Sequence, residues 1–322
     1  MGIPPRDVEL TLRRCSRLRG KELGSLGRPI LALPAKGVWS GPWRPAAPEA
    51  MLEALPGQVR RIREFGAGAV EFLTEVVARD ERYASPAVWR EAAAITRAEG
   101  LEATVHLPFA WVELTSLDRQ VWEGSLRSVE EALRAVEPLA ARMAVVHPAN
   151  HGTQAVLAGT TAPARGEVLG VLGERLVAAL TRLGRAQGGG ALALEYLDGI
   201  PGDLFALVVQ AAGVGVCLDV GHALVGGLDP VELVGEFRGR LLGVHLHDAV
   251  ATATGEGSAH RPLGTGRLDL DGLVAALCRL DFDVPVALEV SGTADDKERS
   301  ARLFLDAVRR QRREGTSGHG RP

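Results

Sequence analysis

Residues 214–223 read VGVCLDVGHA, and this stretch sets the pattern for the whole chain. Five of its first seven residues are apolar, which is typical of a short strand buried on both faces. The run ends at Asp219, and His222 follows three residues later. Because a buried carboxylate or imidazole costs free energy without a partner, we expect a group at this strand end that satisfies both side chains.

Seven further apolar runs of similar length occur along the chain, and together with 214–220 they make eight predicted strands. The other seven are PILALPA (29–35), AVEFL (69–73), LEATVHL (101–107), MAVVHP (143–148), ALALEYL (191–197), LLGVHLHD (241–248) and VPVALEV (284–290).

Segments with apolar residues at helical spacing separate the strands. They cover residues 50–65, 86–99, 119–137, 166–187, 203–212, 230–238, 270–280 and 296–312. Ser85-Pro86 and Asp229-Pro230 are typical helix starts, with a capping side chain followed by proline at the first helical position. Gly100 stands where a helix is expected to end.

Strict alternation of strands and helices predicts an α/β fold with a parallel sheet under helical cover. Eight repeats favour a single closed (β/α)8 TIM barrel, over residues 29–312, rather than an open doubly wound sheet. Residues 1–28 are polar and rich in arginine, and we interpret them as an N-terminal extension. Residues 313–322 are expected to form a disordered tail.

Charge and cysteine content narrow the class of protein. The 37 basic and 40 acidic residues nearly balance, which argues against a protein that mainly binds nucleic acid, without excluding a local basic groove. Cys15, Cys217 and Cys278 show no paired spacing and are expected to be free thiols in a reducing compartment. Without a signal peptide or an apolar run of ~18 residues, the sequence predicts a cytoplasmic protein off the membrane, which can form homo-oligomers.

Lysine is scarce, and the chain has only Lys21, Lys36 and Lys297. An enzyme that forms a Schiff base needs a buried lysine. Of the three, only Lys36 follows a predicted strand closely enough to serve.

Polar residues gather at the carboxyl ends of the predicted strands. Seven of the eight histidines lie there: His106, His147, His151, His222, His245, His247 and His260, with only His319 in the tail. The acids Glu195, Asp219 and Glu289 occupy the same level. A barrel brings these ends together on the face where barrel enzymes keep their active sites.

Carboxylates and imidazoles without thiolates suit a divalent ion such as Mn²⁺, Zn²⁺, Co²⁺ or Mg²⁺. We therefore expect Asp219 to face a metal ion, and His222 to face either a second ion or the substrate.

Six ordered segments resemble the xylose-isomerase-like TIM barrels, which include sugar-phosphate isomerases and epimerases and the endonuclease IV type of abasic-site nuclease (AP endonuclease family 2). The resemblance covers about residues 29–310. Its segments are TVHLPF (104–109), VVHPANHG (145–152), LALEYL (192–197), CLDVGHA (217–223), GVHLHDA with HRPLGTGRLDL (243–249 and 260–270), and VALEV (286–290).

The resemblance implies that one metal ion is held by Glu195, Asp219, His245 and Glu289. His245 is preferred to His247 because it stands three residues before an acid, Asp248, as the family's ligand does. In isomerases and epimerases of this type, the two glutamates also move a proton on opposite faces of the substrate, through an enediolate that the metal stabilises.

Substrate contacts are expected from residues around this centre. They are His106, His222 and His247, and the aromatic residues Phe109 and Trp111, with Trp39 and Trp43 as further candidates for the wall of a pocket that binds a small carbohydrate. The long loop 149–165 is either a lid or a surface turn.

A phosphodiester hydrolase, either an abasic-site nuclease or a small-molecule phosphodiesterase, is the alternative. It would add His106 and His147 to one ion and assign His222 and His260 to another. The aspartate expected near position 258 is Ser258, for which Glu256 is a possible substitute, and Thr265 replaces the glutamate of the family's PLGEG element. These departures also leave open an inactive barrel used for binding.

Overall fold

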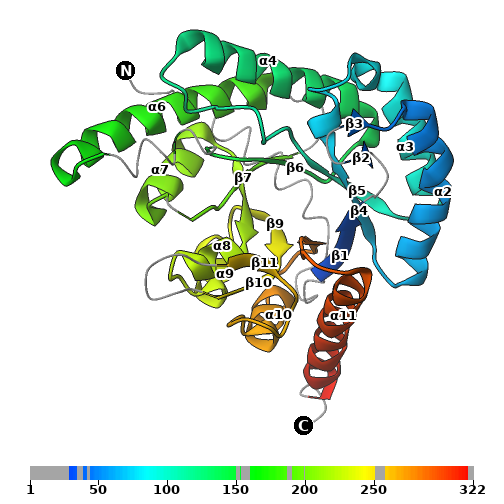
Figure 1. The fold of residues 1–322 in the computed structure, drawn as a ribbon. Coiled ribbons are helices and arrows are strands. Elements are labelled where there is room, and N and C mark those ends of the chain that lie inside the picture. Colours follow the sequence, from blue (N-terminus) through cyan, green and yellow to red (C-terminus); the bar gives the residue numbers. More distant parts are fainter. Residues whose placement is uncertain are drawn as a thin grey trace.

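The computed structural model is a closed barrel of parallel strands surrounded by helices (Figure 1). It describes residues 29–34, 39–41, 44–149, 153, 160–186, 191–198, 200–250 and 258–317. The predicted extension 1–28 and the last residues of the predicted tail lie outside the described part. Within that part, no helix is long and apolar enough to cross a membrane.

Eight strands close the barrel in the order β1-β12-β9-β8-β7-β6-β5-β4, and every neighbouring pair is parallel. Their bounds are β1 Pro29–Pro34, β4 Ala69–Leu73, β5 Glu102–His106, β6 Met143–Val146, β7 Ala191–Glu195, β8 Gly215–Asp219, β9 Leu241–Leu246 and β12 Val284–Leu288. All eight predicted strands and the predicted TIM barrel are confirmed. Most predicted strands run one or two residues too far, because residues just past the strand ends, such as Leu107, Leu197 and Val220, continue the apolar pattern.

Helices cover the outside of the barrel (Figure 1). They are α2 Pro48–Glu64, α3 Pro86–Ala98, α4 Arg119–Val136, α6 Ala162–Ala186, α7 Gly202–Ala212, α8 Val220–Val225, α9 Pro230–Glu236, α10 Leu270–Cys278 and α11 Ala294–Ser317. Short 3-10 turns lie at Thr74–Val76, Glu81–Ala84 and Glu137–Leu139. Two small antiparallel pairs join β2 Trp39–Gly41 to β3 Arg44–Pro45 and β10 Asp248–Val250 to β11 Ser258–Arg261.

The predicted capping signals act as expected. Ser85 accepts a hydrogen bond from Ala87 N, and Asp229 accepts one from Val231 N. After α3, Gly100 has φ +71°, the left-handed conformation that glycine adopts without strain.

Two predicted boundaries differ from the structure. The last helix, α11, continues to Ser317 rather than ending near 312, so the first part of the predicted tail is helical. Helix α6 begins at Ala162, inside the segment 149–165 predicted as a loop. Most of that segment, from residue 150 to 159, lies outside the described residues apart from Thr153.

Alternation along the strands builds the barrel interior in layers. Small residues fill the lower layer: Ala69, Ala193, Cys217, Gly243 and Ala287. Two residues further along the same strands come polar ones: Glu71, Glu195, Asp219, His245 and Glu289. Because side chains two apart point to the same face of a strand, these polar groups converge on the barrel axis at the carboxyl ends.

Candidate active site

Four side chains from separate strand ends meet in the upper layer of the barrel. Each of Glu195, Asp219, His245 and Glu289 offers a ligand atom, and these atoms lie within 4.8 Å of one another. His245 Nδ1 lies 2.9 Å from Glu195 Oε1 and 3.4 Å from Glu289 Oε1. The convergence expected of these four residues is present.

Asp219 has protein partners on both carboxylate oxygens. Its Oδ1 accepts the N–H of His222 at 2.7 Å and so caps α8, and its carboxylate lies 2.9 Å from His247 Nε2. Gly221 allows this packing, since a Cβ there would overlap the His247 ring. The DVGH segment thus positions Asp219 through a short helix and keeps a carboxylate oxygen within 4.8 Å of the other donor atoms of the centre.

The surroundings of the two glutamates shift their pKa values in opposite directions. Burial opposes ionisation of Glu195, but the nearby imidazoles of His245 and His147 hold its pKa well below the ordinary range. Burial raises the pKa of Glu289, which has less compensation. One carboxyl group is therefore held as an anion while the other retains a proton more readily.

The donor set fits a divalent ion. Glu195 Oε2 is buried and makes no hydrogen bond of good geometry to any partner in the described chain. Buried polar atoms rarely stay unpaired. Carboxylate and imidazole donors without thiolate match Mn²⁺, Zn²⁺, Co²⁺ or Mg²⁺. Glu195, Asp219, His245 and Glu289 are the residues that would hold the ion.

A second group of donors shares Glu195. His106 Nε2 lies 3.2 Å from His147 Nε2 and 3.5 Å from Glu195 Oε2, which in turn lies 2.9 Å from His147 Nε2. Ligand atoms around a tetrahedral zinc ion, at about 2.0–2.1 Å from the metal, lie about 3.3 Å apart. The spacing of these three atoms therefore matches a metal site.

Three further histidines form a third group beside the first two. His222, His247 and His260 bring ligand atoms within 4.8 Å of one another. His222 Nδ1 lies 2.6 Å from Asp198 Oδ1, and His260 Nδ1 lies 3.0 Å from the carbonyl oxygen of Glu289. Such partners fix the ring orientation and leave the Nε2 atoms of these two histidines directed elsewhere.

The expectation that His247 contacts the substrate is not supported by its position. Its side chain is fully buried, and it does not line the cavity described below. Nδ1 accepts the backbone N–H of His260 at 2.8 Å, and Nε2 faces Asp219. Because both ring nitrogens have protein partners, His247 has none left for a substrate.

Glu71 on β4 is a buried acid that the sequence reasoning missed. It lies 3.7 Å from His245 Nε2, opposite the side on which His245 faces Glu195 and Glu289. Thr104 Oγ1 donates to Glu71 Oε1 at 3.2 Å. This is the arrangement in which a carboxylate orients a metal-ligating imidazole from behind. The lone acid in AVEFL, two residues after a buried alanine, is the signal that identifies it.

The Glu71→Gln variant is expected to bind the divalent ion about 10–100-fold more weakly, because His245 loses the anion that orients its ring. Titration of the metal-free protein with Mn²⁺ or Co²⁺ measures the change. Glu102→Gln is the matched control, since Glu102 lies on β5 away from the site and pairs with Arg142 at 2.8 Å. Equal affinities for Glu71→Gln and the control would contradict this role.

A cavity of about 660 Å³ opens above the centre, within the usual range for small-molecule sites. His106, His147, Glu195, His222, His260 and Glu289 line it, as does Phe109. The Phe109 ring centroid lies 4.9 Å from that of His106 and 4.7 Å from that of His147. Glu75 fixes this aromatic position by accepting the N–H groups of Phe109 and Ala110.

Trp111, expected to line the pocket, does not. It is 71% exposed, because the chain turns outward at residues 110–111 after Glu75 has fixed the position of Phe109. Trp43, His151, Glu256 and Lys36 lie outside the described residues, and the side chain of Trp39 is likewise not described.

Asp248 organises the loop that contains PLGTG. Its Oδ1 accepts the N–H groups of Ala249 and Leu268, and its Oδ2 accepts those of Gly264 and Gly266, all at 2.8–3.0 Å. A Cβ at Gly266 would overlap this carboxylate, so glycine is required there. Thr265 is exposed, and its hydroxyl donates to Pro262 O within the same turn. It is not one of the groups at the centre.

The fold and the site together define a (β/α)8 barrel with a carboxylate–imidazole centre at the carboxyl ends of its strands. A family model for the xylose isomerase-like TIM barrel matches residues 59–310. The chain therefore belongs to the xylose isomerase-like TIM barrel family, as its sequence motifs indicated.

Solved structures with the same barrel include sugar epimerases. L-ribulose 3-epimerase is 17% identical, with a TM-score of 0.68 over 91% of this chain and 100% of that one. A D-tagatose 3-epimerase-like protein is 17% identical, with a TM-score of 0.65 over 88% and 99%. The 3-keto-D-glucoside 4-epimerase of E. coli is 16% identical, with a TM-score of 0.63 over 88% and 99%. Among curated proteins, none matches this sequence.

Proposed function

We propose that the protein is a divalent-metal-dependent isomerase or epimerase of a small sugar or sugar phosphate. One observation carries the proposal: Glu195 and Glu289 line the same cavity from β7 and the end of β12, and both face Nδ1 of His245, at 2.9 and 3.4 Å. Two carboxylates facing one substrate are the groups that a proton transfer between two faces or two carbons requires.

The chain's own residues supply the acid and the base. Glu195 and Glu289 are the candidate pair, of which one carboxylate removes the proton and the other returns it. An ion bound by these residues would polarise the substrate carbonyl and stabilise negative charge that develops on its oxygens. Phe109 contributes an apolar wall, against which the C–H face of a sugar ring or chain packs.

The structural relatives support this reaction class. The solved structures described above are named as epimerases of ketoses or keto sugars, and their barrels cover almost the whole of this chain. A sugar-sized substrate is also consistent with the volume of the cavity.

Exchange with solvent deuterium tests the proposal across a panel of candidate sugars. The protein is stripped of metal, reloaded with Mn²⁺, Co²⁺, Zn²⁺ or Mg²⁺ in turn, and incubated in D₂O with five- and six-carbon ketoses, aldoses and their phosphate esters. We expect metal-dependent deuterium incorporation next to the carbonyl, together with product, in the NMR spectrum. Conversion that survives complete metal removal would overturn the mechanism.

A phosphodiester hydrolase is the second candidate, and the His106–His147–Glu195 group favours it. Clusters of two or three ions are a common device for cleaving phosphodiesters. Metal counting separates the candidates: one equivalent per chain supports the isomerase, and two or three support the hydrolase. Hydrolysis of bis(p-nitrophenyl) phosphate, or salt-sensitive binding to abasic duplex DNA, would favour the second candidate.

A further inference from the structure

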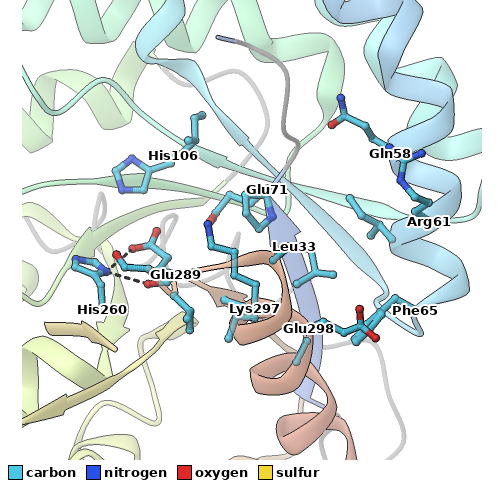
Figure 2. Close-up of a pocket in the computed structure, with 18 of the residues that line it drawn as sticks. Leu33, Gln58, Arg61, Phe65, Glu71, His106, His260, Glu289, Lys297 and Glu298 are labelled. Atoms are coloured by element: carbon cyan, nitrogen blue, oxygen red, sulfur yellow. Dashed lines mark hydrogen bonds and ion pairs between the residues drawn. The ribbon is translucent and has the colours of Figure 1, made fainter. Parts of the chain in front are cut away.

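The cavity extends beyond the carboxylates and imidazoles towards the first and last helices of the barrel. It is also lined by Gln58 and Arg61 from α2, by Phe65 directly after that helix, and by Lys297 from α11. Figure 2 shows the Lys297 side chain extending from α11 into the space that Glu71, His106 and Glu289 also border, with Arg61 on α2 across from it. The catalytic floor and this basic wall thus belong to one continuous cavity.

Lys297 is an unusual residue in this chain. The sequence has three lysines among its 37 basic residues, and Lys297 is the one that lies in the described part. Lys36, the lysine expected near the site, lies outside that part. Lysine gives a compact ammonium on a flexible stem, which suits contact with a phosphate or carboxylate group.

The two cations on this wall stand out from their neighbours within the described residues. Among the residues that the structure describes, neither Lys297 nor Arg61 has an ion-pair partner. Their neighbours differ: Arg63 pairs with Glu99 at 2.9 Å. Glu298, the acid on the same wall, is paired with Arg302 at 2.6 Å.

Charge is therefore divided along the cavity. The acids Glu71, Glu195 and Glu289 come from the strand ends and lie among imidazoles. Lys297 and Arg61, which have no acidic partner in the described chain, come from α11 and α2. A neutral sugar offers no charged group for these two cations to bind. A sugar with an anionic group on its far end would satisfy both cations through charge-assisted hydrogen bonds. Gln58 Oε1, buried on the same wall without a partner among the described residues, offers an acceptor for a sugar hydroxyl.

We propose that Lys297 and Arg61 form a subsite for the terminal anionic group of the substrate, a phosphate ester or a carboxylate, while the carbonyl end lies at Glu195 and Glu289. This assignment rests on the proposed isomerase or epimerase function. It makes the substrate a sugar phosphate or a sugar acid rather than a free sugar.

Binding of inorganic phosphate to the metal-loaded protein tests the subsite without turnover. By calorimetry, Lys297→Met and Arg61→Met are each expected to weaken phosphate binding about tenfold or more, since each removes a charge-assisted hydrogen bond. Arg299→Met is the matched control, because Arg299 is exposed on the same helix and does not line the cavity. Phosphate that binds only the metal would be unaffected by all three changes, which would overturn the proposal.

Turnover gives a second and independent measurement. We compare kcat/KM for a ketose phosphate with kcat/KM for the same ketose without phosphate. A second ratio compares a sugar acid with the corresponding neutral sugar. We expect one of these ratios to favour the anionic substrate and to fall at least about tenfold in Lys297→Met, mainly through KM. Which ratio falls identifies the anionic group. Should Lys297→Met fail to fold, Arg61→Met at an exposed position provides the same comparison.

The outcomes separate this subsite from the proposed function. The protein could isomerise free sugars with no preference for the anionic form, and the variants could bind phosphate as the unmodified protein does. These two results together would overturn the subsite and leave the proposed function standing. Phosphate binding that depends on Lys297, without deuterium exchange in any sugar, overturns the function and leaves the subsite standing.

Discussion

Glu195→Gln is expected to lose its bound metal and at least about a thousandfold of its activity. The reason is that Glu195 belongs to two donor groups, one with Asp219, His245 and Glu289 and one with His106 and His147. The glutamine side chain is neutral, so neither group keeps the negative charge of Glu195. Its NH₂ group is a hydrogen-bond donor, whereas the N–H groups of the neighbouring imidazoles need an acceptor. Metal content by mass spectrometry and the deuterium-exchange rate measure the two losses.

The comparison with Glu289→Gln makes this prediction specific. Glu289 belongs to the central group and to a group with His106 and His245, but not to the group that contains His147. If the chain holds one ion at the central group, both variants lose it. If a second ion lies at His106, His147 and Glu195, Glu289→Gln retains that ion and Glu195→Gln loses both. Glu102→Gln, remote from the site, should match the unmodified protein. Full metal content in Glu195→Gln would contradict the assignment of the centre.

Removal of the metal is expected to abolish activity and to lower stability substantially. A ligand present at a thousand times its Kd stabilises the folded state by about 4 kcal/mol. For a domain of this size, that corresponds to a fall in Tm of roughly 10 °C on chelation. The physical cause is the return of repulsion among Glu195, Asp219 and Glu289, which only imidazoles then offset. Thermal unfolding with and without chelator measures the change.

The size of this stabilisation should depend on pH. Burial lowers the pKa of His106 and His222, but Glu195 and Asp198 outweigh it and raise both to about 9 in the metal-free protein. Because these values exceed the ordinary value near 6.5, the stability that the two protons provide is complete below about pH 6.5 and is lost as the pH rises through 9. A divalent ion held by Glu195 and Asp219 disfavours those protons, because it repels the positive charge of the imidazolium groups and neutralises the carboxylates that stabilise them.

The difference in Tm between metal-loaded and chelated protein is therefore expected to widen from pH 6.5 to 9. Asp198→Asn, which removes the partner of His222, should reduce the part of this pH dependence that His222 contributes. A difference in Tm that stays constant from pH 6.5 to 9 would show that metal binding does not release protons from these imidazoles.

The barrel was predictable because nearly all residues of its strands are apolar. Buried parallel strands contain apolar residues on both faces, so runs such as AVEFL and VGVCLDV stand out from the helices between them. Helix α8 was missed because its six residues follow Asp219 directly and continue the apolar pattern of the strand. A short helix of this kind depends on the cap and on packing against His247, not on its own periodicity.

The site was predictable where one strand position decides the direction of a side chain. Glu195, Asp219, His245 and Glu289 each stand two residues after a small inward residue, and the same step would have found Glu71. Contacts beyond the strand ends depend on loop geometry, which explains the errors at His247 and Trp111. Lys297 and Arg61 come from helices distant in sequence, and only the closed barrel brings them to one cavity.

The carboxylate of Asp248 has a consequence for how molecules enter. Main-chain amides of Gly264, Gly266 and Leu268 tie this loop to the end of β9, so this flank of the mouth cannot swing aside without breaking a set of charge-assisted bonds. We therefore expect this flank to stay fixed while solutes enter, and a solute that passes between α2 and α11 comes close to Arg61 and Lys297, which favour an anion.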